Sequence, residues 1–399
     1  MKYASWLPLL LGFLSATGPL STDMYLPAFP AIEADLGLPL GGVQVTLAAW
    51  FAGLAVGQMT QGSLADRFGR RTPLLFSTVI FTLANIGCAL SRDVGTLTVM
   101  RFVAAMAGSA SMVIPRAIVR DLAEGHAAAK MMSRLILVSG VAPIVAPSLG
   151  GLMLIFASWH MIFWFFVAYG AICSVLVQLY LPDTLLPERR VRQNPVEMVS
   201  RYWDIACEPL FLTHALMGAF GMFAIFAYLG GSPGVFIDGM HFSPSVYAVM
   251  FSSCAACFVL CSQINPRLLQ VYGASLVKTW AVRGGLLGAV ALTLVAFLSP
   301  YIPGGTQWWM IVPAAMVILG SQGFNMPNTT VGGLQRHAAH AGAASALMGM
   351  LGFCLAAMSG LLVGQLSDGT ARGMAVLMLI GTLCANIADR YRLRASRPV

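Results

Sequence analysis

Long apolar runs recur along the whole chain, and each is long enough to cross a lipid bilayer as a helix. A crossing needs about 20 predominantly apolar residues. Twelve runs meet this requirement, namely 5–27, 43–64, 74–91, 96–119, 134–157, 162–181, 209–229, 245–265, 278–298, 307–330, 341–366 and 372–390. Barrel strands would alternate over about ten residues, so these continuous runs predict an all-α membrane protein with twelve transmembrane helices.

Charged residues are scarce, which excludes most soluble functions. They make up 10% of the 399 residues, whereas soluble proteins carry about 25%. A net charge of +8 would fit a nucleic-acid partner only if the basic residues formed a patch on a soluble face. They lie instead in the gaps between apolar runs. We therefore expect a lipid bilayer as the surrounding medium and no nucleic-acid partner.

One long polar stretch divides the twelve runs into six and six. It covers residues 182–208 and contains several charged residues, including Glu188, Arg190 and Arg201. The division predicts an N-terminal six-helix bundle over 1–181, a linker over 182–208 and a C-terminal six-helix bundle over 209–399. Two repeated halves of this kind are typical of transporters that bind a substrate between them.

The basic residues also predict an orientation in the membrane. Nineteen of the 23 Lys and Arg residues fall on one set of sides, Arg92 and Arg372 fall on the other, and Arg101 and Arg116 lie within the run 96–119. Positive residues accumulate in cytoplasmic loops. Both termini and the linker are therefore expected in the cytoplasm, and the first run is expected to be a membrane helix rather than a cleaved signal peptide.

A glycine- and arginine-rich loop separates the second and third runs. Its key positions are Gly62, Asp66, Arg67, Gly69, Arg70 and Arg71. This pattern resembles the G-x3-D-R-x-G-R-R loop of the major facilitator superfamily, in which the loop gates the two halves. The glycines permit a tight turn, Asp66 can sit at a positive helix N-terminus, and the arginines can pair with Asp121. The second half has only a degraded copy of the pattern around Arg267.

The fifth run carries a second resemblance, to the antiporter motif of drug exporters. The matching positions are Gly140, Pro143, Pro147, Gly150 and Gly151, with Ala142 where many members have glycine. Two prolines four residues apart remove helix hydrogen bonds and bend the helix, and small residues let a neighbouring helix approach. Ordinary packing of small residues is the alternative explanation.

The segments 23–30, 120–121 and 158–164 look like the Bcr/CflA branch of drug:proton antiporters. The superfamily resemblance covers the whole chain, whereas the branch resemblance depends mainly on the first half. It implies a monomer in a bacterial inner membrane that exports small, moderately apolar drugs by alternating access, driven by protons. The same fold exporting a metabolite, such as an amino acid or a sugar, is the alternative.

Two charges at membrane depth point to the site of proton coupling. A charge in hydrocarbon is costly unless it is paired or hydrated, so each one is a functional candidate. Asp23 and Arg101 fall at similar depth near the outer side, and we hypothesise that Asp23 is the coupling carboxylate and Arg101 modulates it. Alternatively, Asp23 caps a helix end and Arg101 snorkels outward. Arg116 is expected to pair or snorkel rather than to take part in transport.

Polar and aromatic residues within the runs are candidates for a substrate cavity. They are Tyr25, Trp50, Gln58, Phe223, Phe226, Gln322, Asn325 and Asn328. Aromatic side chains suit apolar ligands, but lipid contact or helix packing is an alternative for each of them. The three amides of the run 307–330 share one helix face, and they suit either a cavity or interhelical hydrogen bonds.

Other functions lack the residues that they need. No phosphate-binding G-x4-G-K-[ST] loop and no hydrolase motif occurs in the sequence. The eight cysteines lie mostly in apolar runs and do not supply four converging metal ligands. We expect no catalytic residues, no metal and no cofactor. A membrane-embedded hydrolase and a receptor-like protein are the less favoured alternatives.

Overall fold

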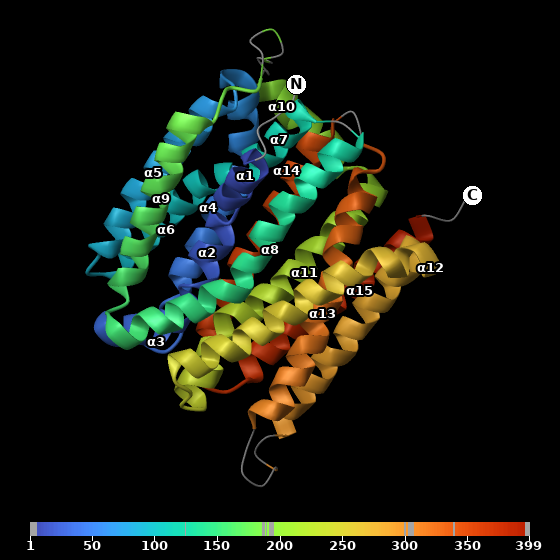
Figure 1. Ribbon diagram of the computed structural model, residues 1–399. Coiled ribbons are helices and arrows are strands. Elements are labelled where there is room, and N and C mark those ends of the chain that lie inside the picture. Colours follow the sequence, from blue (N-terminus) through green and yellow to red (C-terminus); the bar gives the residue numbers. More distant parts are fainter. Residues whose placement is uncertain are drawn as a thin grey trace.

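The computed structural model shows an all-helical membrane protein (Figure 1). It describes residues 6–123, 125–185, 188, 190, 195–298, 301, 307–337 and 340–395. Within these ranges the regular secondary structure is entirely helical. The predicted fold class is therefore correct.

The helices of the first half follow the chain in a simple order. They are α1 (Leu7–Ser15), α2 (Thr17–Asp23), η1 (Leu26–Ala28), α3 (Phe29–Asp35), α4 (Gln44–Phe68), α5 (Arg71–Ala89), α6 (Val94–Gly108), α7 (Ala110–Leu122), α8 (Gly125–Phe156) and α9 (His160–Tyr180). The first predicted run is thus broken into α1 and α2, and the fourth is split into α6 and α7 around Ser109. Each of the six runs of this half is nevertheless helical.

The second half begins with a helix that the sequence analysis did not predict. This is α10 (Pro195–Ala206), within the polar stretch 182–208. The others are α11 (Pro209–Pro233), η3 (Gly234–Gly239), α12 (Pro244–Leu298), α13 (Trp308–Leu334), α14 (Ala341–Gln365) and α15 (Arg372–Ala395). Two predicted runs join in α12, which bends at Gly273, where φ is 76°. Glycine adopts such a positive φ without the steric cost that a side chain brings.

The helices differ in how clearly they qualify as membrane spans. Eight helical segments of the described chain are long and apolar enough to cross a bilayer, and α12 alone covers two predicted runs. In α8 the described apolar segment is Gly140–Phe156, and the broken first run and the polar α4 fall outside this set. Their polar or broken character is what a helix lining a transport path needs.

The two ends of the helix bundle differ in chemistry. One, here called the basic end, carries Arg67, Arg70, Arg120, Arg134 and Arg201 on α4, α7, α8, α10 and the loop before α5. The other, the opposite end, carries α3, η3 and the loop before α4. Helices from the two halves of the chain pack against each other, most extensively α4 against α14 and α8 against α12 (Figure 1). A single large apolar core extends across both halves.

Candidate functional site

A cavity of about 730 Å³ opens at the basic end between the two halves of the chain. Its walls come from α4, α7, α8, α10, α11, α13 and α14. The volume lies in the range of sites for drug-sized molecules, about 300–1,000 Å³. Methionines and Phe353 form much of the apolar wall, which suits ligands of variable shape. The methionines are Met59, Met112, Met132, Met222, Met326 and Met348.

The opposite end is closed by direct contacts between the halves. The Gln44 amide on α4 donates to the Gly230 carbonyl of α11 at 3.2 Å. Gly364 on α14 packs against the Gly41 backbone, where a Cβ would lie 2.7 Å from the carbonyl oxygen. Open at one end and closed at the other, the molecule has the geometry of one state of an alternating-access cycle.

Most of the predicted cavity residues lie elsewhere. Gln58 lines the cavity together with residues of the gating loop. Tyr25 and Trp50 are fully buried instead, and Phe226 packs on Phe51 with ring centroids 4.0 Å apart. Phe223 is buried in the apolar core. The aromatic residues therefore build the closed side of the bundle in this state, and the expected cavity role is not seen for them.

The three amides of α13 form hydrogen bonds rather than line the cavity. Asn328 and Asn265 of α12 bond reciprocally through their side chains, at 2.8 and 3.3 Å. The Asn325 amide donates to the Met217 carbonyl of α11 at 3.2 Å and to Gln322 Oε1 at 3.1 Å. Interhelical hydrogen bonding, the second of the two alternatives, thus describes Asn325 and Asn328, whereas Gln322 bonds within α13. An amide in a membrane span satisfied in this way holds its helices in register.

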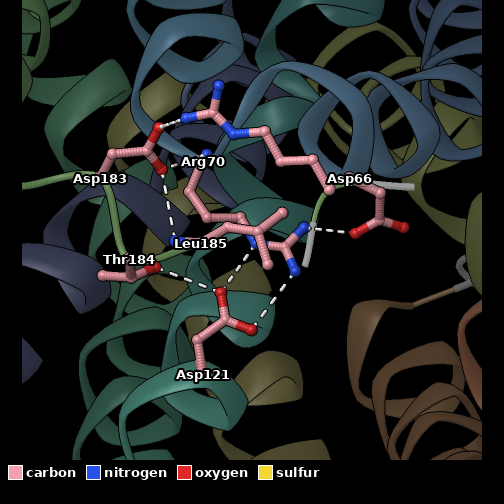
Figure 2. A network of polar contacts seen from close by, with 7 residues as sticks. Asp66, Arg70, Asp121, Asp183, Thr184 and Leu185 are labelled. Atoms are coloured by element: carbon pink, nitrogen blue, oxygen red, sulfur yellow. Dashed lines mark hydrogen bonds and ion pairs between the residues drawn. The ribbon is translucent and has the colours of Figure 1, made fainter. Parts of the chain in front are cut away.

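The loop between α4 and α5 is a tight turn locked by Arg70 (Figure 2). The Arg70 guanidinium binds Asp66 and, at 2.8 Å through Nε, Asp121 at the end of α7. Thr184 Oγ1 also donates to Asp121, at 3.1 Å. The expected ion pair between Arg70 and Asp121 is present. Both carboxylates that bind the Arg70 guanidinium, those of Asp66 and Asp121, belong to the first half. Charge-assisted contacts of this kind make the loop, α7 and the segment after α9 one unit.

Asp183, rather than Asp66, occupies the N-terminus of α5. The backbone amide of Arg70, the N-cap of α5, donates to Asp183 Oδ1 at 2.8 Å. Asp183 also pairs with Arg190 at 2.8 Å. Gly69 has φ of 90° and lies directly against the Asp183 carboxylate, so a side chain there would be both strained and obstructed. The expectation that Asp66 lies at a helix N-terminus is therefore corrected for α5. The Arg70 guanidinium binds Asp66 instead.

The other motif residues of this loop form fewer close contacts in the structure. A Cβ on Gly62 would meet only Val113, at 3.8 Å, so no close approach requires glycine there in this state. Arg67 is exposed, with its guanidinium 5.2 Å from the Phe68 ring centre. Arg71 donates to the Gln178 carbonyl of α9.

Asp23 is a buried carboxylate at the contact between the halves. It ends α2 and its residue is 6% exposed. It lies near the Tyr247 hydroxyl of α12, which bonds Ser232 of α11 at 2.9 Å. Among the described residues no cation pairs with Asp23. A carboxylate buried without a cation is stable chiefly in its neutral form.

Arg101 does not pair with Asp23 in this conformation. It is fully buried on α6, and Nη1 donates to the Ser21 carbonyl at 3.1 Å. Its guanidinium carbon lies 4.2 Å from the Trp50 ring centre and 4.6 Å from that of Tyr25. The Ser21 backbone carbonyl and the Tyr25 ring thus hold Arg101, and Asp23 forms no ion pair with it.

The motif of α8 sits where α8 meets both halves. Gly150 packs against the Met24 backbone of the first half, and Gly151 packs against α12, where a Cβ would be 3.0 Å from the Pro244 carbonyl oxygen. Ser252 of α12 donates to the Ile144 carbonyl at 2.6 Å. Gly140, in contrast, has open space around its Cα. α8 runs through Pro143 and Pro147 as one continuous helix.

Gly151→Leu is expected to lower the transport rate by about tenfold, because overpacking of one to three kcal/mol shifts the balance between the two states. The side chain would separate α8 from α12 and disfavour closure of the opposite end. Gly140→Leu is the matched control, since nothing lies within 4 Å of its Cβ position. The comparison is made by substrate flux in membrane vesicles at equal expression. Equal flux in the two variants would contradict a closure role for Gly151.

Glu33 is a second buried acid, outside the membrane spans, that sequence reasoning missed. It lies on α3, is 7% exposed, and accepts a hydrogen bond from the Val43 amide at 3.2 Å. Burial, and then the nearby Asp238 carboxylate of η3, raise the pKa of Glu33 to about 7. Because burial raises this pKa above its ordinary value of 4.5, the contact loses stability as the pH rises from about 4.5 to about 7, and the loss is complete above about pH 7. Nothing in the local sequence pattern marks Glu33 as buried.

A second missed cluster joins α11, α12 and α15 on the side of the C-terminus. The Lys278 ammonium lies 2.9 Å from His214 Nε2, and Asp389 accepts from Thr279 at 2.9 Å and pairs with Arg392 at 2.7 Å. All five side chains are buried. The residues of different helices lie more than 60 positions apart in the sequence. No sequence motif therefore groups them.

Comparison with known proteins agrees with this architecture. The family model of the Major Facilitator Superfamily matches residues 11–362. The uncharacterized MFS-type transporter YdgK of Bacillus subtilis is 33% identical over 385 residues, covering 96% of this chain and 94% of that protein. A bicyclomycin resistance protein homolog of Haemophilus influenzae is 28% identical over 370 residues, covering 93% and 92%. Multidrug resistance protein MdtL of Shewanella oneidensis is 26% identical over 366 residues, covering 92% and 90%.

Solved structures show the same fold at low identity. The nucleoside transporter NupG superposes with a TM-score of 0.72 at 14% identity, covering 98% of this chain and all of that one. A bacterial homolog of the human lysosomal transporter Spinster, in an inward-facing and occupied conformation, gives a TM-score of 0.72 at 17% identity, covering 100% and 98%.

The helices, the cavity between the halves and these comparisons define a multi-pass membrane protein that is a secondary transporter and not an enzyme. The chain belongs to the Major Facilitator Superfamily.

Proposed function

We propose that the protein exports small, moderately apolar drugs across a bacterial inner membrane by alternating access, in exchange for protons that move inward. The observation that carries the proton coupling is Asp23, buried without a cation at the contact between the halves. The two relatives whose names refer to bicyclomycin or multidrug resistance support drugs as the substrate class. Export of a metabolite such as an amino acid or sugar is the second candidate.

The proposal includes an orientation and a division of labour. The basic end faces the cytoplasm by the positive-inside rule, with both termini there, so the present state is open to the cell interior. Residues 1–181 and 209–399 act as two bundles that rock about the central site, joined by the linker 182–208. The protein acts as a monomer without a cofactor. Its gating loop and the motif of α8 hold the contacts that change between states.

A flux measurement tests the function as a whole. The chain is expressed in a host that lacks its own drug exporters. A proton gradient is imposed across everted membrane vesicles from this host, and the uptake of drugs into the vesicles is measured. We expect uptake of drugs into the vesicles that stops when an uncoupler collapses the gradient and persists when ATP is removed. Uptake that survives the uncoupler would contradict proton coupling. Uptake of amino acids or sugars but not of drugs would favour the second candidate.

A further inference from the structure

The charges of the cavity are strongly asymmetric. Four arginines line it, Arg70, Arg116, Arg120 and Arg201, against the single carboxylate of Asp66 among the described residues. Asp66 is already bound to Arg70. The remaining arginines give the cavity an excess of positive charge, and a cleft lined by one sign of charge concentrates ions of the other sign.

Arg116 is the deepest of these cations. It lies six residues before the end of α7, about 9 Å along the helix axis by the usual rise per residue. Met112, Arg116 and Arg120 are four residues apart, so they share the face of α7 that lines the cavity. Arg116 is solvent-exposed on that face, and no carboxylate of the described chain forms an ion pair with it. Its expected pairing is therefore not found.

We infer that Arg116 binds the carboxylate of amphipathic organic anions, and that such anions are preferred substrates of this cavity. The inference rests on the proposed export function and names its substrate class. A guanidinium at membrane depth is costly without a counter-ion, and its planar fork matches a carboxylate in two parallel hydrogen bonds. The apolar part of the ligand would lie against Met222, Met348 and Phe353, which line the same cavity.

Two further features agree with an anionic ligand. Arg120 and Arg201 also line the cavity and attract anions toward it before they reach Arg116. Gln58, Thr329 and Thr330 supply neutral polar groups on the facing walls, which orient a ligand without adding charge. A basic ligand would meet Asp66 alone, and that carboxylate is held by Arg70.

The test uses three ligands with one apolar body. Biphenyl-4-acetate, its amide and the corresponding primary amine are titrated into the purified full-length protein by calorimetry. Wild type is expected to bind the carboxylate about tenfold or more tightly than the amide, and the amine most weakly. Arg116→Gln should remove this preference and leave the affinity for the amide unchanged. Arg116→Lys keeps the positive charge without the planar fork, so it should retain only part of the preference, and it shows that the position tolerates substitution.

Arg283→Gln is the matched control for loss of a cation. Arg283 is an exposed arginine of α12 that does not line the cavity. The inference is overturned if wild type binds the three ligands alike, if Arg116→Gln weakens all three equally, or if Arg283→Gln has the same effect. Binding needs no proton gradient, so it is separate from the proposed function. A carboxylate preference in binding without gradient-driven flux would contradict proton-coupled export and leave the inference intact.

Discussion

Asp23→Asn is expected to reduce proton-driven efflux to the background level while the protein still binds its substrate. Asparagine has nearly the shape of aspartate but cannot take up or release a proton. Asp23 is the acid at the contact between α2 and the second half, where it lies near Tyr247. Opening of the other end would hydrate this contact and favour the ionised form, so the proton balance changes with the conformational cycle.

The measurement separates coupling from transport itself. Substrate-induced proton movement and substrate flux are followed in proteoliposomes with an imposed pH gradient, and exchange of labelled for unlabelled substrate is followed without one. We expect exchange to persist in Asp23→Asn and both gradient-driven signals to disappear. Asp93→Asn is the matched control, because Asp93 is exposed and caps α6, and asparagine caps a helix equally well. Unchanged proton-coupled efflux in Asp23→Asn would remove Asp23 from the mechanism.

Arg101 and Asp23 occupy separate sites, which their similar depth in the membrane did not indicate. The helical rise placed the two residues at similar depth, which made a contact feasible. Depth along two helices does not give the direction of a side chain around each helix. In the structure the Ser21 carbonyl and the Tyr25 ring hold Arg101 of α6, while Asp23 lies near Tyr247 of α12. The hypothesis that Arg101 modulates Asp23 stays a prediction.

The fold could be predicted from the sequence because its cause is local. Each run of apolar residues is long enough to determine a helix in lipid by itself. The turn after α4 was equally predictable, since glycine, aspartate and arginine at close spacing act over a few residues. The break at Gly273 falls in the predicted gap between the runs 245–265 and 278–298. The helix α10 was not predicted, because it lies in a polar stretch.

The cavity could not be predicted in the same way, because it depends on which faces of seven helices meet. Trp50 and Gln58 lie two turns apart on α4, and only Gln58 reaches the cavity. Aromatic residues were favoured on chemical grounds, but they pack into the closed side of the bundle. Arg116 was expected to pair or to snorkel, and it lines the cavity instead. The sequence did contain one indication that Arg116 lines the cavity, namely its position on the same helix face as Met112 and Arg120.

Arg70→Gln is expected to impair both stability and transport. The change leaves Asp66 and Asp121 facing each other without the guanidinium that joins them (Figure 2). We expect a loss of about 3 kcal/mol, the low end for removal of one partner of a buried ion pair, since the Asp66 side chain is 41% exposed. The loop would no longer hold α4, α5 and α7 together, so the flux should fall along with the melting temperature.

A double variant separates repulsion between the acids from loss of the loop's structure. In Arg70→Gln with Asp121→Asn, one unpaired carboxylate is neutralised, so part of the stability should return and the coupling energy of the cycle measures the pair. Arg71→Gln is the matched control, because Arg71 contacts a single carbonyl, that of Gln178. Melting curves in detergent and flux in proteoliposomes are compared for all variants. If Arg70→Gln and Arg71→Gln behave alike, the network around Arg70 does not organise this end of the first half.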